Sequence, residues 1–153
     1  MITVTQFTEG GKLPANLTGN ADFTIAILNE IFSALPGRFR FSSGWRSAVD
    51  NRAAGGVANS YHVQALAGDF VPVNGQFTAE NKSVILSIIN KYAYELIIHD
   101  VGSGLHYHIE PSPSFSKDIM TRAPSSSAPQ AAAIGAGAFL GILVVVAILD
   151  EIL

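Results

Sequence analysis

Residues 105–110 read LHYHIE, and this strict alternation of apolar and polar side chains predicts a β-strand with two different faces. One face would point toward a hydrophobic core and consists of Leu105, Tyr107 and Ile109. The opposite face would carry two imidazoles and a carboxylate, those of His106, His108 and Glu110. This strand is therefore the first candidate for a functional site.

A second short strand is predicted over Leu66–Val71, where one acidic residue interrupts an apolar run. The alternation places Asp69 on the same face as Ala67 and Val71. A buried carboxylate without a partner costs several kcal/mol, so Asp69 needs one. Both a metal ion and an arginine, Arg46 or Arg52, would satisfy it.

The remaining elements predict the fold class. One helix has apolar residues at helical spacing and ends at Pro36-Gly37; these residues are Phe23, Ile27, Leu28, Ile31 and Leu35. A second helix should follow Thr78 as its N-cap, with an apolar face of Ile85, Ile88, Ile89 and Tyr92. Two further strands are predicted over Arg38–Ser42 and Glu95–His99. We expect an α+β protein with a small, mostly antiparallel sheet flanked by helices.

Histidine and aspartate side chains from three segments form a candidate metal site. His62 lies in a turn-like stretch rich in Gly, Asn and Ser and precedes Asp69 by seven residues. Catalytic zinc sites usually have three protein ligands and one open position, which two histidines and one aspartate would supply. His62, Asp69 and His108 are therefore the candidate ligands, and the alternative is a set of polar core residues that satisfy one another. His99 and Asp100 lie at the end of a predicted strand and are interpreted as a turn, not as ligands.

The composition limits the class of protein. The chain has 153 residues, a formal net charge of −3 and no cysteine. This length is enough for one compact domain, and the absence of a basic run argues against a nucleic-acid partner. Without thiolates, any metal must be held by histidine and carboxylate side chains. The first residues, MITVTQFTEGGK, lack the pattern of a signal peptide, so that export route is not expected.

The chain divides into three predicted regions: a domain over 1–110, a Pro/Ser/Ala-rich linker over 111–130, and a hydrophobic segment over 131–153. Within the last region, Ala131–Leu149 carries no charged side chain and is long enough for a helix that spans a membrane.

Gly137 and Gly141 of this segment form a GxxxG pair that permits close packing and possible self-association of such helices. The alternative is a buried or self-associating helix at the end of the domain. We expect a protein anchored in a membrane through this C-terminal apolar helix.

Three ordered motifs resemble those of the M15 family of zinc peptidases, which includes D-Ala-D-Ala carboxypeptidases and phage endolysins. The first is the SGxR segment, Ser43-Gly44-Trp45-Arg46. The second is S-x-H-x(6)-D, from Ser60-Tyr61-His62 to Asp69. The third is the late histidine element, His106-Tyr107-His108-Ile109-Glu110. The resemblance covers roughly residues 20–110 and implies a Hedgehog/DD-peptidase-type fold.

The resemblance also implies roles for individual residues. It implies that zinc is held by His62, Asp69 and His108 and that Arg46 lies beside the substrate. His106 matches the position of a catalytic histidine in one branch of the family. Independently of the resemblance, Glu110 could orient His108 or act as the acid/base itself, and the favoured alternative is a solvated charge at the end of the strand.

One position departs from the family pattern. Ala65 stands where the family usually has glycine, three residues after the first histidine. Glycine readily adopts a positive φ, where alanine is strained. If this position requires a positive φ, the loop that carries His62 shifts and the site is weakened.

The expected function is hydrolysis of peptide bonds in bacterial peptidoglycan by a zinc-dependent D,D- or L,D-type peptidase. The substrate would be a stem peptide or a cross-bridge, and the protein would be a phage-encoded lysin or a virion-associated enzyme. The alternative is a catalytically degenerate relative that serves as a structural or binding protein in a membrane or virion.

Overall fold

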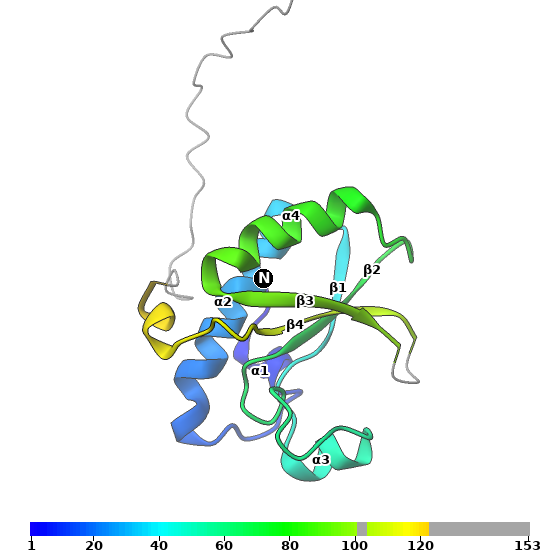
Figure 1. Cartoon of the computed structure of the whole chain (residues 1–153). Helices are drawn as coiled ribbons and strands as arrows, with labels where there is room; N and C mark the ends of the chain where they lie inside the picture. Colours follow the sequence, from blue (N-terminus) through cyan, green and yellow to red (C-terminus); the bar gives the residue numbers. More distant parts are fainter. Residues whose placement is uncertain (101–103, 123–153) are drawn as a thin grey trace, which may run out of the picture.

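The computed structural model describes residues 1–100 and 104–122. In this part of the chain, a four-stranded antiparallel sheet has the order β1-β2-β4-β3 (Figure 1). The strands are β1 (Phe39–Ser43), β2 (Gly68–Pro72), β3 (Tyr94–His99) and β4 (His106–Pro111). The helical elements are α1 (Val4–Phe7), η1 (Ala15–Leu17), α2 (Thr18–Ala34), α3 (Ala48–Ala53), α4 (Ala79–Ile89), η2 (Asn90–Tyr92) and η3 (Lys117–Arg122). The predicted α+β class with an antiparallel sheet is confirmed.

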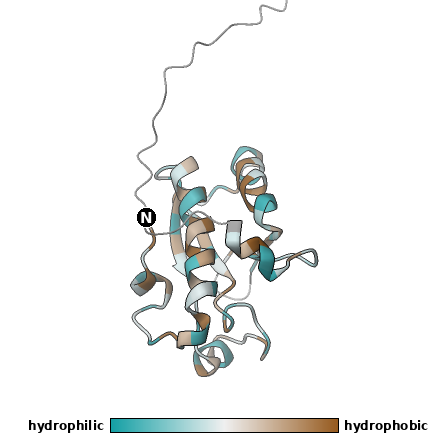
Figure 2. Cartoon of the chain, turned by 90° about the vertical axis from the view of Figure 1, so that its left-hand side faces the viewer, coloured by the Kyte–Doolittle hydropathy of each residue, from teal (hydrophilic) through white to brown (hydrophobic). Residues whose placement is uncertain are grey.

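The two longest helices, α2 and α4, form as the sequence predicts. The side chain of Thr78 caps α4 by accepting a hydrogen bond of 3.1 Å from the Asn81 amide. Helix α2 ends at Ala34, and Gly37 follows with a φ of 71°. Teal and brown residues occur together on the helices in Figure 2. Helix α4 has one buried and one exposed side, whereas α2 is buried on all sides over 23–28.

The hydrophobic core lies between these helices and one face of the sheet. From the sheet it contains Phe70, Tyr107 and Ile109, all with no exposed surface. From the helices it contains Phe23, Ile27, Ile85 and Ile89, among others. Phe70 and Tyr107 lie on adjacent strands with ring centroids 5.4 Å apart. Because side chains alternate along a strand, this packing directs Asp69, His106 and His108 to the opposite face.

The strand bounds differ from the predicted ones by one or two residues. The clearest consequence is at Leu105, which was expected in the core but precedes β4 and is 56% exposed. Tyr107 and Ile109 supply the apolar face of this strand without it.

Ordered structure continues beyond the predicted start of the linker at 111. Strand β4 includes Pro111, and η3 lies within the predicted linker. Phe115 packs against the core, with its ring centroid 6.0 Å from that of Phe23 and 5.8 Å from that of Tyr94. Apolar side chains at Phe115, Ile119 and Met120 therefore attach this stretch to the domain.

No helix within 1–100 or 104–122 is long and apolar enough to cross a membrane. The segment predicted to do so, 131–153, lies outside the described residues, as do Gly137 and Gly141.

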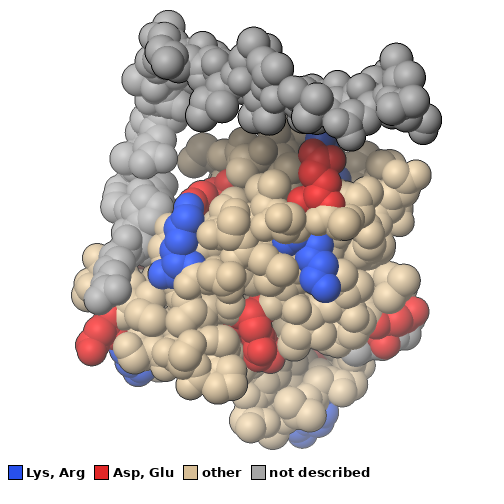
Figure 3. All heavy atoms as spheres, turned by 45° about the horizontal axis from the view of Figure 1, so that its top comes forward, with Lys and Arg blue, Asp and Glu red and all other residues tan. Residues whose placement is uncertain are grey.

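Charged residues make up only 14% of the chain. On the face shown in Figure 3, the few acidic and basic side chains are scattered over a mostly neutral surface, some of them side by side, and neither sign forms a continuous patch.

Candidate active site

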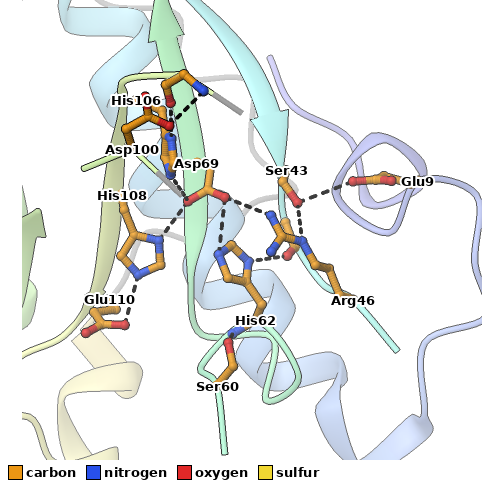
Figure 4. A network of polar contacts seen from close by, with 12 residues as sticks. Glu9, Ser43, Arg46, Ser60, His62, Asp69, Asp100, His106, His108 and Glu110 are labelled. Carbon is orange, nitrogen blue, oxygen red and sulfur yellow. Dashed lines mark hydrogen bonds and ion pairs between the residues drawn. The ribbon is translucent and has the colours of Figure 1, made fainter. Parts of the chain in front are cut away.

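Asp69 is the centre of a polar network on the sheet face opposite the core (Figure 4). Its Oδ1 accepts a hydrogen bond of 2.7 Å from His108 Nδ1, and its Oδ2 accepts one of 3.0 Å from Arg46 Nη2. His62 Nε2 lies 3.3 Å from the same Oδ2. The structure thus brings together the three candidate ligands, which come from β2, β4 and the loop before β2.

The electrostatic surroundings keep Asp69 ionised. Its side chain is 6% exposed, and burial alone would raise its pKa. Hydrogen bonds from His108 and His62, together with their charges, outweigh burial and hold the pKa of Asp69 well below its ordinary value. For His108, burial lowers the pKa, but the hydrogen bonds and charges of Asp69 and Glu110 raise it above its ordinary value overall.

The backbone and a second carboxylate fix which histidine nitrogens face Asp69. His62 Nδ1 lies 2.6 Å from the Gly44 carbonyl oxygen, which can only accept, so Nδ1 carries the proton and Nε2 faces the site. His108 Nε2 donates to Glu110 Oε2 at 2.9 Å, so its Nδ1 faces the site. Histidines that bind metals usually have such an orienting partner on the other nitrogen.

The geometry of the three side chains fits a metal ion. His62, Asp69 and His108 each offer one ligand atom, and these atoms all lie within 4.8 Å of one another. Two ligands about 2.1 Å from a tetrahedral zinc are about 3.4 Å apart, close to the 3.3 Å between His62 Nε2 and Asp69 Oδ2. The residues therefore have the types, burial and spacing of a metal site.

The loop that carries His62 is held to neighbouring segments by backbone hydrogen bonds. The Arg46 amide donates to the His62 carbonyl at 3.3 Å, which links the SGxR segment to this loop. Position 44, in the SGxR segment, requires glycine, because a Cβ there would overlap the carbonyl and ring of Phe7. Glycine at 44 therefore allows its carbonyl to reach His62.

Ala65 adopts the left-handed conformation that its family counterpart suggested, with a φ of 58°. Its amide donates to the His62 carbonyl at 3.1 Å, and its carbonyl accepts from Thr24 Oγ1 at 3.0 Å. The residue is completely buried. Packing and hydrogen bonds therefore hold the alanine in a conformation that costs about 1–2 kcal/mol, and the loop keeps His62 beside Asp69.

Four histidines meet at this site, one more than the candidate residues included. His99 was interpreted as part of a turn, but it ends β3 directly opposite His106 on β4. Its ring centroid lies 4.6 Å from that of His106 and 5.3 Å from that of His108. Burial and the charges of His106 and His108 lower the pKa of His99. The signal that could have found it is the antiparallel pairing of the last two strands.

His106 lies beside the three candidate ligands. Its Nδ1 lies 3.0 Å from the Gly104 carbonyl oxygen and therefore donates to it. This leaves Nε2 directed at the site, 3.8 Å from Asp69 Oδ1. The ring is buried, with 6% of the residue exposed.

Arg46 is the arginine that neutralises Asp69, whereas Arg52 is exposed on α3. Arg46 Nε also donates to Ser43 Oγ at 2.9 Å, and Ser43 Oγ donates to Glu9 Oε1 at 3.3 Å. Figure 4 shows this chain of contacts leading away from Asp69. Glu9 is a residue of the site that the sequence did not reveal, because it lies far from the motifs in the chain.

These residues line a cleft of about 1000 Å³. One side is formed by the sheet, with Arg40, Val71 and Glu110 among its residues. The other side is formed by the end of α3 and the loop after it, over 53–57. A cleft of this volume can hold several residues of a peptide.

The sequence pattern of the Peptidase M15 family matches residues 3–99, and the chain belongs to this family. No curated protein and no solved structure gave a match. His62 and Asp69 lie inside the matched range, whereas His106 and His108 lie beyond it. The structure connects the two parts, because β4 pairs with β2 and aligns His108 with Asp69.

Proposed function

We propose that this peptidase is a zinc enzyme that hydrolyses peptide bonds in bacterial peptidoglycan. The observation that carries the proposal is the buried cluster of His62, Asp69 and His108 at the base of a large cleft, with each imidazole oriented by its own partner. Zinc bound there would lower the pKa of a water molecule toward about 7 and polarise a carbonyl group.

We assign the proton transfer to His106. Its Nδ1–H is held by the Gly104 carbonyl, so its Nε2 is free to accept a proton from water in the cleft and return it to the leaving nitrogen. Glu110 was the other candidate for this role, but its Oε2 accepts the Nε2–H of His108. We therefore assign Glu110 to the orientation of His108.

We assign Arg46 to the substrate. Its guanidinium lies beside Asp69 with its side chain 24% exposed, so it borders both the ligands and the cleft. From this position it can donate to a carbonyl oxygen that gains negative charge during hydrolysis, or to a substrate carboxylate. The bond from Nε to Ser43 restrains the plane of the guanidinium while its Nη groups donate.

The alternative function, that of a catalytically degenerate structural or binding protein, would be favoured if alanine at position 65 distorted the loop that carries His62. The left-handed backbone of Ala65 keeps the loop formed, which favours a working enzyme. A role as a phage lysin or virion-associated enzyme, attached through 131–149, extends the proposal and rests on the sequence alone.

The test uses purified full-length protein, zinc and peptidoglycan fragments of several wall types, with products identified by mass spectrometry. We expect one type of peptide bond to be cleaved, in a D,D or L,D position. The matched variants are Asp69→Asn, which should abolish cleavage, and Asp22→Asn, which changes an exposed aspartate and should not. Absence of product from every wall type with zinc bound would refute the proposal.

A further inference from the structure

One flank of the cleft carries a basic side chain without a partner among the described residues. Arg40 lies on β1 and is exposed, and its side chain makes no hydrogen bond or ion pair within that part of the chain. It lines the large cleft and also a neighbouring hollow of about 430 Å³. Arg38, just before β1, pairs with Glu80 of α4, and Arg46 pairs with Asp69.

The same flank carries an acidic side chain. Glu9 is exposed, lines the cleft, and receives a hydrogen bond from Ser43 through one carboxylate oxygen only. Its backbone has a φ of 51°, a conformation that is strained for a non-glycine residue and is enriched at functional sites. This strained position presents a carboxylate to the cleft.

Strand pairing sets the distance between the two charges. Ser43, which holds Glu9, pairs with Asp69, whereas Arg40 pairs with Val71. Asp69 and Val71 are two residues apart on β2, about 7 Å, because a register shift between Phe41 and Ser43 takes up the additional residue of β1. Glu9 therefore lies beside the candidate ligands and Arg40 lies further along the cleft. Glu9 and Arg40 form no ion pair with each other.

We propose that Glu9 and Arg40 together bind a substrate side chain whose terminal carbon carries both an ammonium and a carboxylate group. An ammonium and a carboxylate on one carbon are about 3 Å apart, and each ionic hydrogen bond adds about 2.8 Å, giving a span of about 8–9 Å. Glu9 is held at Ser43, about two residues along the sheet from Arg40, and the long side chain of Arg40 can extend along the cleft to cover this span. In peptidoglycan, diaminopimelate is the residue with this chemistry, so the inference rests on the proposed function and narrows its substrate.

The two charges together would discriminate among related residues. A lysine side chain would satisfy Glu9 and leave Arg40 unpaired, whereas a lone carboxylate would be repelled by Glu9. One charge-assisted hydrogen bond contributes about 1.5–3 kcal/mol, so the loss of the carboxylate should cost roughly tenfold or more in kcat/KM.

The test compares stem peptides that are identical except for diaminopimelate or lysine at one position, using the zinc-loaded full chain. We expect the diaminopimelate peptide to have a kcat/KM roughly tenfold higher. In Arg40→Gln the ratio between the two peptides should fall to about one. The matched control is Arg38→Gln, which removes the same charge outside the cleft and should keep the wild-type ratio.

Binding of both peptides to the zinc-free protein, measured by calorimetry, separates this inference from the proposed function. Tighter binding of the diaminopimelate peptide that is lost in Arg40→Gln would support the subsite even if neither peptide is cleaved. Equal cleavage and equal binding of the two peptides would overturn the subsite and leave the peptidase assignment intact. A preference that survives Arg40→Gln, or is lost equally in Arg38→Gln, would also overturn it.

Discussion

Replacing Glu110 separates its role from that of His106. Glu110 Oε2 accepts the Nε2–H of His108 at 2.9 Å, and the Glu110 side chain is 22% exposed. The loss of such an orienting carboxylate typically weakens metal binding by about 10- to 100-fold, or about 1.4–2.7 kcal/mol. Because glutamine keeps a carbonyl acceptor, Glu110→Gln should weaken zinc binding about tenfold, whereas Glu110→Ala should weaken it about a hundredfold.

His106 variants should show the opposite pattern. His106→Gln removes the proposed proton acceptor but none of the three ligands, so zinc affinity should stay within about threefold of wild type, whereas the zinc-saturated kcat should fall by about 10²- to 10⁴-fold. In Glu110→Gln, kcat at saturating zinc should fall by less than tenfold.

The assay pairs a competitive zinc titration against a chromogenic chelator with kcat measured at saturating zinc. Both variants should be checked for unchanged circular dichroism. If Glu110→Gln loses kcat by more than a hundredfold with normal zinc affinity, Glu110 is the acid/base and the assignment to His106 is wrong.

Three further predictions concern stability and substrate binding. In zinc-free protein, the raised pKa of His108 contributes stability below its ordinary pKa of 6.5 that is lost as pH rises through the folded-state value. The Tm in EDTA should therefore fall as the pH rises above the ordinary pKa of 6.5, and a flat profile, or the same slope in His108→Gln, would contradict this cause. Ala65→Gly should change the free energy of unfolding by less than about 1 kcal/mol, because relief of strain is offset by the lost methyl group and added chain entropy. Ala65→Val should destabilise by about 2 kcal/mol or more in urea titrations, and tolerance of valine would show that this position is not strained. Arg46→Lys cannot reproduce the bonds to both Ser43 and Asp69, so kcat/KM should fall about tenfold or more with zinc retained; wild-type kinetics would exclude Arg46 from substrate binding.

Local patterns in the sequence predicted most of the sheet and both long helices. Alternation along LHYHIE assigned His106 and His108 to one face and Tyr107 to the core, as the structure shows. Thr78 was identified as the cap of α4 because the residues that follow it have helical periodicity. These features depend on neighbouring residues, which a single sequence displays directly.

Features that depend on distant residues were not predictable in the same way. His99 joins the site because β3 pairs with β4 in one particular register, and Glu9 joins it through a bond to Ser43 that crosses 34 positions. Leu105 was misplaced because alternation does not specify where a strand begins. The positive φ of Ala65 was anticipated only because the family usually has glycine at this position. Alanine is held in this conformation in part by the hydrogen bond that Thr24 donates to its carbonyl, a contact between residues far apart in the chain.

The central claim is that one zinc ion binds to His62, Asp69 and His108, and anomalous X-ray diffraction from crystals grown with zinc tests it most directly. We predict a single strong peak at the zinc edge, bonded to His62 Nε2, a carboxylate oxygen of Asp69 and His108 Nδ1. A peak elsewhere in the domain, or coordination through His62 Nδ1 or His108 Nε2, would contradict the account.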